Sequence, residues 1–131
     1  MNEKQAIDKV IEICKSNEYV EVCGFLGFKK DSNEFIVEEQ ENISDDPSNY
    51  FLISPVNYLL FKDRVDDMIV FHSHINGDEK PSEFDVKVAN NCCDPFLIYS
   101  LVSKKIHIYT PQNSEVDVSI IQRLKEAYDN N

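Results

Sequence analysis

The chain has 131 residues, with 13 basic and 24 acidic side chains and a net charge of −11. This length predicts a single domain, residues 1–131, with enough chain to bury a core. The acidic balance argues against nucleic acid or an anionic membrane as a partner, because both are polyanions, and a basic protein or peptide surface would be attracted instead. The first residues are too polar for a secretory signal, and no apolar run could span a bilayer.

The four cysteines contain no pair at CxxC spacing, so a ribbon-type zinc site is not expected. Reduced thiols are the simplest interpretation, and they predict a cytoplasmic protein.

The first part of the chain predicts a helix followed by a hairpin. Apolar residues recur at helical spacing over residues 3–16. Residues 19–28 are rich in Val, Phe and Leu and predict a strand, and residues 34–43 predict its returning partner. Gly24 and Gly27 interrupt the first strand, which indicates a bulge or a close backbone approach.

The rest of the chain predicts alternating strands and helices. These elements are a strand at 50–53, a helix from Ser54-Pro55 to about Asp66, a strand at 68–74, a helix at 82–91, strands at 96–102 and 106–109, and a C-terminal helix marked by Val116, Ile120, Ile121 and Leu124 that frays at 129–131. Such a mixed order favours an α/β (α+β) fold in which helices pack on a single mixed sheet.

Two of the three histidines, His72 and His74, stand at the end of the predicted strand 68–74. Alternate side chains of a strand point to the same face, so both imidazoles are expected to project together. Catalytic zinc usually has three protein ligands and a water molecule. Asp85, eleven residues after His74, is the natural third ligand.

The segment His72-Ser73-His74, seven residues, Ser82, two residues, Asp85 resembles the JAMM motif of the MPN/JAB metalloprotease family. The similarity extends from about Tyr19 to Tyr109 and is strongest to the prokaryotic and phage branch, which includes the amino-terminal domain of phage tail-assembly protein K. Shorter segments that resemble this branch are Glu21-Val22-Cys23-Gly24, Asn42-Ile43, Pro47, Phe51 to Pro55 and Tyr58.

The resemblance implies an MPN/JAB-like curved sheet between helices, with cytidine deaminase-like layering, and one Zn²⁺ per chain held by His72, His74 and Asp85. It also implies that Glu21 is the general base, although the sequence alone leaves Glu18, Glu34 and Glu38 as rivals. A carboxylate near the metal can take a proton from water and pass it to the leaving amine.

Ser82 and Asp85 have a second interpretation that involves no metal. Ser82-Glu83-Phe84-Asp85 is also a capping box, with Ser82 at the N-cap of a helix and an acid at N3. For Ser82 the cap and the oxyanion donor that the resemblance implies can coexist. For Asp85 we expect the two roles to compete, because a carboxylate on zinc would turn away from the Ser82 amide.

The sequence therefore predicts a JAMM-type zinc metallopeptidase that hydrolyses a peptide or isopeptide bond of a protein or peptide substrate. The resemblance implies substrates such as ubiquitin-like or sulfur-carrier tails, or a role in phage tail assembly. The alternatives are a catalytically silent MPN-type scaffold that binds proteins, and a zinc site that only stabilises the fold. Silent members usually lack ligands that this chain retains, and a structural site would need a fourth protein ligand.

Overall fold

The structure is a computed structural model that describes residues 1–130. Its elements, in chain order, are α1 (Glu3–Lys15), β1 (Cys23–Lys29), β2 (Glu34–Gln40), α2 (Pro55–Lys62), β3 (Asp67–His74), α3 (Glu83–Cys92), β4 (Phe96–Ser100), β5 (Ile106–Tyr109) and α4 (Val118–Asp129). The predicted fraying at 129–131 includes Asn131, which lies outside the described residues.

The strands form one sheet in the order β2-β1-β3-β4-β5. β3 runs parallel to β4, and the other neighbouring strands are antiparallel. The predicted α/β class, a mixed sheet flanked by helices, is confirmed. Among residues 1–130, no helix combines the length and the apolar character needed to cross a bilayer.

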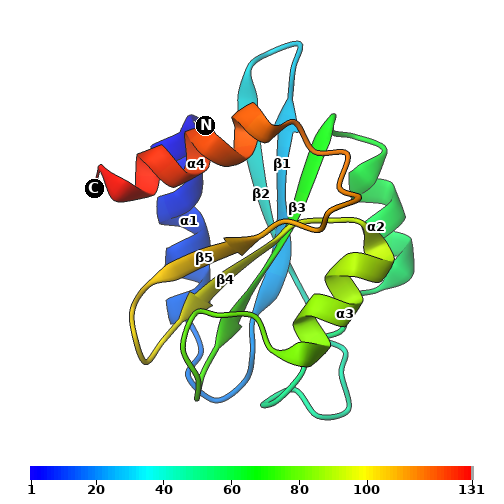
Figure 1. Cartoon of the computed structure of the whole chain (residues 1–131). Coiled ribbons are helices and arrows are strands. Elements are labelled where there is room, and N and C mark those ends of the chain that lie inside the picture. Colours follow the sequence, from blue (N-terminus) through cyan, green and yellow to red (C-terminus); the bar gives the residue numbers. More distant parts are fainter. Residues whose placement is uncertain (131) are drawn as a thin grey trace.

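Two apolar clusters hold the helices against the sheet. One joins α1 and α4 to side chains such as Leu26, Phe71 and Leu97, and the other joins α2 and α3 to Phe25, Val70 and Ile98. Figure 1 shows α1 and α4 together on one side of the view, with α2 and α3 on the other. Because strand side chains alternate, β3 contributes its odd-numbered residues to the first cluster and its even-numbered residues to the second.

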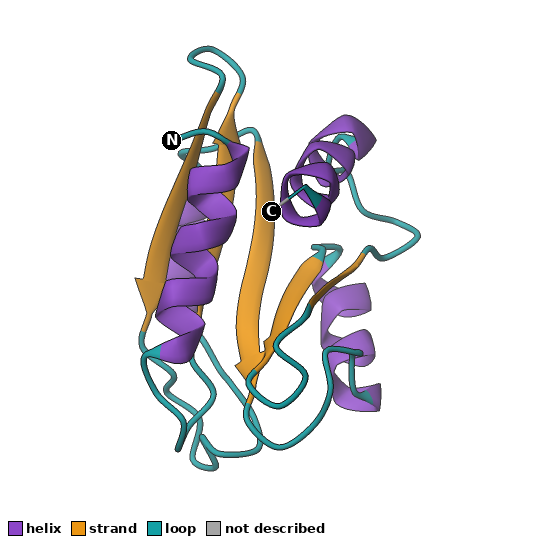
Figure 2. Ribbon diagram, turned by 90° about the vertical axis from the view of Figure 1, so that its left-hand side faces the viewer, coloured by secondary structure: helices purple, strands orange, loops and turns teal. Residues whose placement is uncertain are grey.

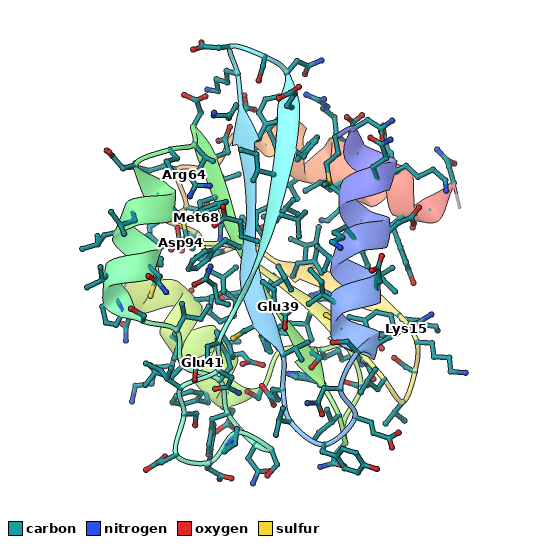
Figure 3. The ribbon with its side chains drawn as sticks, turned by 180° about the vertical axis from the view of Figure 1, so that it is seen from behind. Lys15, Glu39, Glu41, Arg64, Met68 and Asp94 are labelled. Atoms are coloured by element: carbon teal, nitrogen blue, oxygen red, sulfur yellow. The ribbon has the colours of Figure 1, made fainter. Side chains whose placement is uncertain are left out.

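Loops that follow α1, β2 and β3 gather at one end of the sheet, the lower end in Figures 1 and 2. These loops bring together parts of the chain that are far apart in sequence. Arg64 and Asp94, both labelled in Figure 3, lie on the side of the sheet that carries α2. The exposed Arg64 pairs with Glu38 of β2, and the buried carboxylate of Asp94 accepts a hydrogen bond from Tyr58 of α2. The latter bond fixes the end of α3 to α2.

The predicted strand at 50–53 is wrong. The amide of Tyr50 donates to the carbonyl of Asp46, and the amide of Leu52 donates to the side chain of Asn42. A single bond from the Ile43 amide to the Leu52 carbonyl resembles strand pairing. The segment is apolar enough for a strand, but its backbone groups are satisfied within the loop.

Several helices and strands are also shorter than predicted. β1 begins at Cys23 instead of residue 19, because the side chain of Asn17 accepts the amides of Tyr19 and Val20. The elements predicted at 34–43, 54–66 and 96–102 end earlier, and α4 starts only at Val118.

Gly24 and Gly27 mark close approaches, and β1 passes both without a bulge. A β-carbon at Gly24 would overlap the Phe71 ring and the Glu38 carbonyl oxygen. At Gly27 it would overlap Val65 and Phe61. Of the two alternatives left open by the sequence, the structure therefore shows close backbone approach.

Gly24→Ala is expected to lower the free energy of unfolding by about 1–3 kcal/mol, because the added methyl group overpacks the core. Gly77→Ala is the matched control, since a β-carbon there meets no heavy atom within 4 Å. It should change stability by less than about 0.5 kcal/mol. Urea unfolding of both variants gives the comparison, and equal effects would contradict the packing argument.

Candidate metal centre

His72 and His74 lie at the carboxyl-terminal end of β3, on the face that also carries Val70. Their rings are neighbours, with centroids 5.2 Å apart. Ser73, between them, points the other way, and its hydroxyl accepts a hydrogen bond from the amide of Val22 at 3.0 Å. The structure thus brings the two imidazoles together as the alternation of a strand predicts.

Asp85, in the first turn of α3, faces both histidines. Its Oδ1 lies 3.2 Å from His72 Nε2, and its Oδ2 lies 2.9 Å from His74 Nε2. All three side chains are largely buried. The first turn of α3 therefore places a carboxylate beside the histidine pair, although Asp85 follows His74 by eleven residues in the sequence.

The capping box at α3 is present at the same time. Ser82 Oγ accepts the Asp85 amide at 3.0 Å, and Asp85 Oδ2 accepts the Ser82 amide at 3.0 Å. We expected the cap and zinc ligation to compete for Asp85, and in the metal-free structure its carboxylate makes the cap while it lies close to both histidines. A carboxylate has several lone pairs, so Oδ2 can accept from the helix start while the group still faces both rings.

The ring of His72 is enclosed by aromatic side chains. Phe51 stacks on it at a centroid distance of 4.4 Å, and Phe96 packs edge-on at 5.5 Å. Both ring nitrogens are buried, and neither makes a hydrogen bond among residues 1–130, even though Nε2 lies near Asp85. A buried imidazole without a hydrogen-bond partner is costly unless another species completes it.

The three residues fit a zinc ion. One ligand atom from each lies within 4.8 Å of the others. Two ligands about 2.0–2.2 Å from a tetrahedral zinc are roughly 3.3–3.6 Å apart, and the distances from Asp85 to His72 and His74, 3.2 and 2.9 Å, are slightly shorter, so a small outward shift would admit the ion. The donor set of two imidazoles and one carboxylate is one that zinc commonly takes. The unsatisfied Nε2 of His72 is the atom that such an ion would complete.

His74 is oriented from its far side. Its Nδ1 lies 2.7 Å from the carbonyl oxygen of Asp78, in the loop after β3. An Nδ1–H that donates to this oxygen leaves Nε2 free to face Asp85, which is the usual arrangement around a metal-binding histidine. The loop is held in turn by Ser100 Oγ, which donates to the Gly77 carbonyl at 2.6 Å.

Burial and mutual contact set the charge states of the metal-free group. Burial lowers the pKa of His72. Burial also acts to lower the pKa of His74, but hydrogen bonds to Asp85 and to the Asp78 carbonyl raise it overall. For Asp85, burial acts to raise the pKa, and the close approach of both histidines together with the Ser82 amide holds it well below its usual range. The carboxylate is therefore ionised, as a metal ligand requires.

Glu21 lies beside this group on the wall of an open cleft of about 340 Å³. Other parts of the lining are His74, Ser82, the loop residues Ser48 and Asn49, and most of the segment 75–81. Glu21 as a whole residue is 7% exposed, and no hydrogen bond or ion pair of its carboxylate is found among residues 1–130. Burial raises its pKa to about 8, with His74 lowering it and Asp85 raising it to smaller extents.

The other acidic candidates lie elsewhere. Glu38 pairs with Arg64, Glu34 begins β2 at the opposite end of the hairpin, and Glu18 is exposed outside the cleft lining. Among these four acids, only Glu21 lines the cleft. Ser82 is exposed at the cleft, and its hydroxyl hydrogen is not used by the cap, where the oxygen is the acceptor.

Sequence reasoning missed several residues that shape this site. Phe51 covers His72, Asp78 orients His74, and Asn42 contacts the backbone of Glu21. Asn42 and Phe51 fall in segments that resemble the prokaryotic JAB branch, so a signal existed without an indication of role. Asp78 acts through its main-chain oxygen, which leaves no sequence signal.

Comparison with known proteins places the chain in a family. The profile of the family described as prokaryotic homologs of the JAB domain matches residues 3–116. The chain belongs to this family. No functionally curated protein is similar enough in sequence to count as a match.

A solved structure supports the fold. The solution structure of protein DSY2949 from Desulfitobacterium hafniense is similar to this chain with a TM-score of 0.63 and 22% sequence identity. The similarity covers 87% of this chain and 85% of that protein. At this identity the likeness concerns the fold alone.

The Glu21 carboxyl should make the metal-free protein less stable as the pH rises. Its folded pKa of about 8 lies above its ordinary value of 4.5, so the folded state binds the proton more tightly. The corresponding stability is fully present below about pH 4.5 and is lost as the pH rises to about 8, with a slope of up to about 1.4 kcal/mol per pH unit. Glu21→Gln should remove this contribution.

Urea unfolding in the presence of a chelator, from pH 4.5 to 8.5, measures the effect as the difference between wild type and variant. Glu18→Gln, at an exposed position, is the control and should follow the wild-type pH profile. Parallel profiles for wild type and Glu21→Gln would show that the carboxyl titrates normally in the folded protein.

Proposed function

We propose that this chain is a zinc-dependent metallopeptidase of JAMM type that hydrolyses a peptide or isopeptide bond. The observation that carries the proposal is the convergence of His72 Nε2, His74 Nε2 and the Asp85 carboxylate beside a cleft whose wall holds Glu21. Metal ligands and a buried, unpaired carboxylate in one cleft are what metal-assisted hydrolysis needs.

The number of ligands favours a catalytic over a structural zinc site. Among residues 1–130, the group of potential ligands consists of His72, His74 and Asp85 only. Structural zinc is usually enclosed by four protein ligands, whereas catalytic zinc leaves a position for water or substrate. The open cleft next to His74 supports the second case.

When bound, zinc would supply a Lewis acid that polarises the scissile carbonyl and makes water more acidic. The carboxylate of Glu21 would accept a proton from the attacking water as the new C–O bond forms. It would then deliver this proton to the leaving amine nitrogen as the C–N bond breaks. Burial raises the pKa of Glu21 in the metal-free protein, and the charge of a bound zinc would oppose that rise, so the carboxylate would be ionised and able to accept the proton.

Ser82 would stabilise the oxyanion of the tetrahedral intermediate. Its oxygen accepts the Asp85 amide, which leaves the hydroxyl hydrogen available as a donor toward the cleft. A donor placed where negative charge develops lowers the barrier by a few kcal/mol. The cap thus supports the proposed donor role, because it fixes the position of the hydroxyl oxygen.

The proposed substrate is the tail of a protein, such as a ubiquitin-like or sulfur-carrier protein. An open cleft suits an extended peptide better than a compact small molecule. The net charge of −11 would favour partners with a basic surface.

Protein purified without a chelator or a histidine tag should contain about one zinc per chain by elemental analysis. His74→Ala and Asp85→Asn should each lower the zinc content strongly, because each removes one of three ligands. Ser82→Ala is the matched control. It removes the cap beside Asp85 and should cost about 1 kcal/mol of stability while zinc is retained.

Wild-type protein that takes up no zinc, even after incubation with the metal, would contradict the enzyme proposal and favour a silent protein-binding scaffold. Normal zinc content in Asp85→Asn would remove Asp85 from the ligand set and leave it as a helix cap.

Glu21→Gln should abolish hydrolysis and leave zinc content unchanged, because the variant keeps the size of the side chain and loses the base. Loss of a general base typically lowers kcat by about 10²–10⁴-fold. The measurement is cleavage of peptide and isopeptide-linked tails by purified protein, with Glu18→Gln as the control. Activity that survives in Glu21→Gln would assign the base to another residue.

A further inference from the structure

The backbone of Glu21 is held outside the regular sheet. β1 begins only at Cys23, so Glu21 has no partner in the strand ladder. Its amide instead donates to the carbonyl of Pro47 at 2.8 Å, and its own carbonyl accepts from Asn42 Nδ2 at 2.9 Å. Both partners belong to the loop between β2 and α2, the lower loop in Figure 1.

Asn42 uses its whole side-chain amide to build this loop. Besides Glu21, Nδ2 donates to the carbonyl of Tyr50 at 3.0 Å and approaches that of Pro47 at 3.4 Å. Oδ1 accepts the amides of Ser44 and Leu52, both at 3.1 Å. Only a primary amide offers donors and an acceptor side by side in this way. An aspartate of the same shape would place an oxygen against the carbonyl oxygens.

The side chain of Glu21 depends on this backbone contact, because its carboxylate has no hydrogen-bond or ion-pair partner of its own among residues 1–130. On the next residue, Val22, the amide and carbonyl bond to Ser73 between the two histidines. The distance from Glu21 to the histidines is thus set by Ser73 on one side and by Asn42 and Pro47 on the other.

We propose that Asn42 is a positioning residue for Glu21, whose side-chain amide holds the Glu21 carbonyl so that the carboxylate stays at the cleft wall beside His74. This inference rests on the proposed function, in which Glu21 is the base. The loop that carries Asn42 also supplies Ser48 and Asn49 to the cleft lining, so one amide orders both the base and part of the cleft wall.

The test uses Co²⁺ in place of zinc, because the visible absorption spectrum of Co²⁺ reports ionisation at the metal site. Wild type, Glu21→Gln, Asn42→Ala, Asn42→Asp and the double variant Glu21→Gln/Asn42→Ala are compared between pH 5 and 9. Asn57→Ala is the matched control, an exposed asparagine of α2 whose side chain makes no hydrogen bond among residues 1–130. Thermal unfolding checks that each variant is folded.

All variants should bind one Co²⁺ per chain. The pH at which the change in the Co²⁺ spectrum is half complete is the midpoint that we compare. It should move in Asn42→Ala and Asn42→Asp in the same direction as in Glu21→Gln, and Asn57→Ala should match wild type. The double variant should be the same as Glu21→Gln alone, because Asn42 acts through Glu21. With a cleaved substrate, kcat should fall about 10- to 100-fold, since misplacement of about 1 Å has that effect, and KM should change little.

An Asn42→Asp variant that is folded and has the wild-type midpoint would overturn the role of Asn42 and leave the proposed function intact. Additive shifts in the double variant would also overturn it, since Asn42 would then act independently of Glu21. If the midpoint of Glu21→Gln is identical to that of wild type, Glu21 is not the base. That result would overturn both the proposed mechanism and the positioning role of Asn42. Asn42→Asp keeps the bonds to Ser44 and Leu52, so it remains informative if Asn42→Ala does not fold.

Discussion

The antiparallel register between β1 and β3 is the constraint on which the site depends. It places Cys23 opposite His72 and continues through the bonds between Val22 and Ser73. Glu21 therefore arrives beside His74 at the end of the sheet. A slip of one residue would turn both histidines to the face covered by α1 and α4. The apolar side chains that alternate along β3 hold this register, so the packing of the core also fixes the geometry of the polar group.

Asp85 shows how one carboxylate can serve the fold and the site together. Helix α3 needs an acceptor for the Ser82 amide, and the histidine pair needs a negative charge. Both needs are met because the group sits at the third position of the helix, where Oδ2 accepts the Ser82 amide and faces His74 while Oδ1 faces His72. Its ionisation is maintained by the imidazoles against the effect of burial. The start of the helix is consequently tied to the end of β3 by a polar contact.

Sequence patterns within a single strand or helix start predicted the parts of the site that depend only on that element. Alternation along β3 placed His72 and His74 on one face, and the Ser82 pattern predicted the helix cap. The prediction of a strand at Tyr50 to Ile53 was wrong because the side chain of Asn42, eight or more residues away, makes hydrogen bonds to the backbone of this segment. The choice of Glu21 over other acids came from family resemblance, since proximity to His74 arises from strand pairing across about fifty residues. Asn42 could not be assigned a role for the same reason.

The aromatic enclosure of His72 has a consequence for how an ion would enter and leave. Phe51 and Phe96 hold that ring on two sides, and Asp85 is fixed by the start of α3, so neither group can turn without disturbing the core. The ring of His74 is 13% exposed and is held by a loop carbonyl. Exchange of metal would therefore follow an ordered route, with His74 as the first contact to release and the last to form. The loop 75–81, which holds His74 through the Asp78 carbonyl, would then govern how long an ion stays bound.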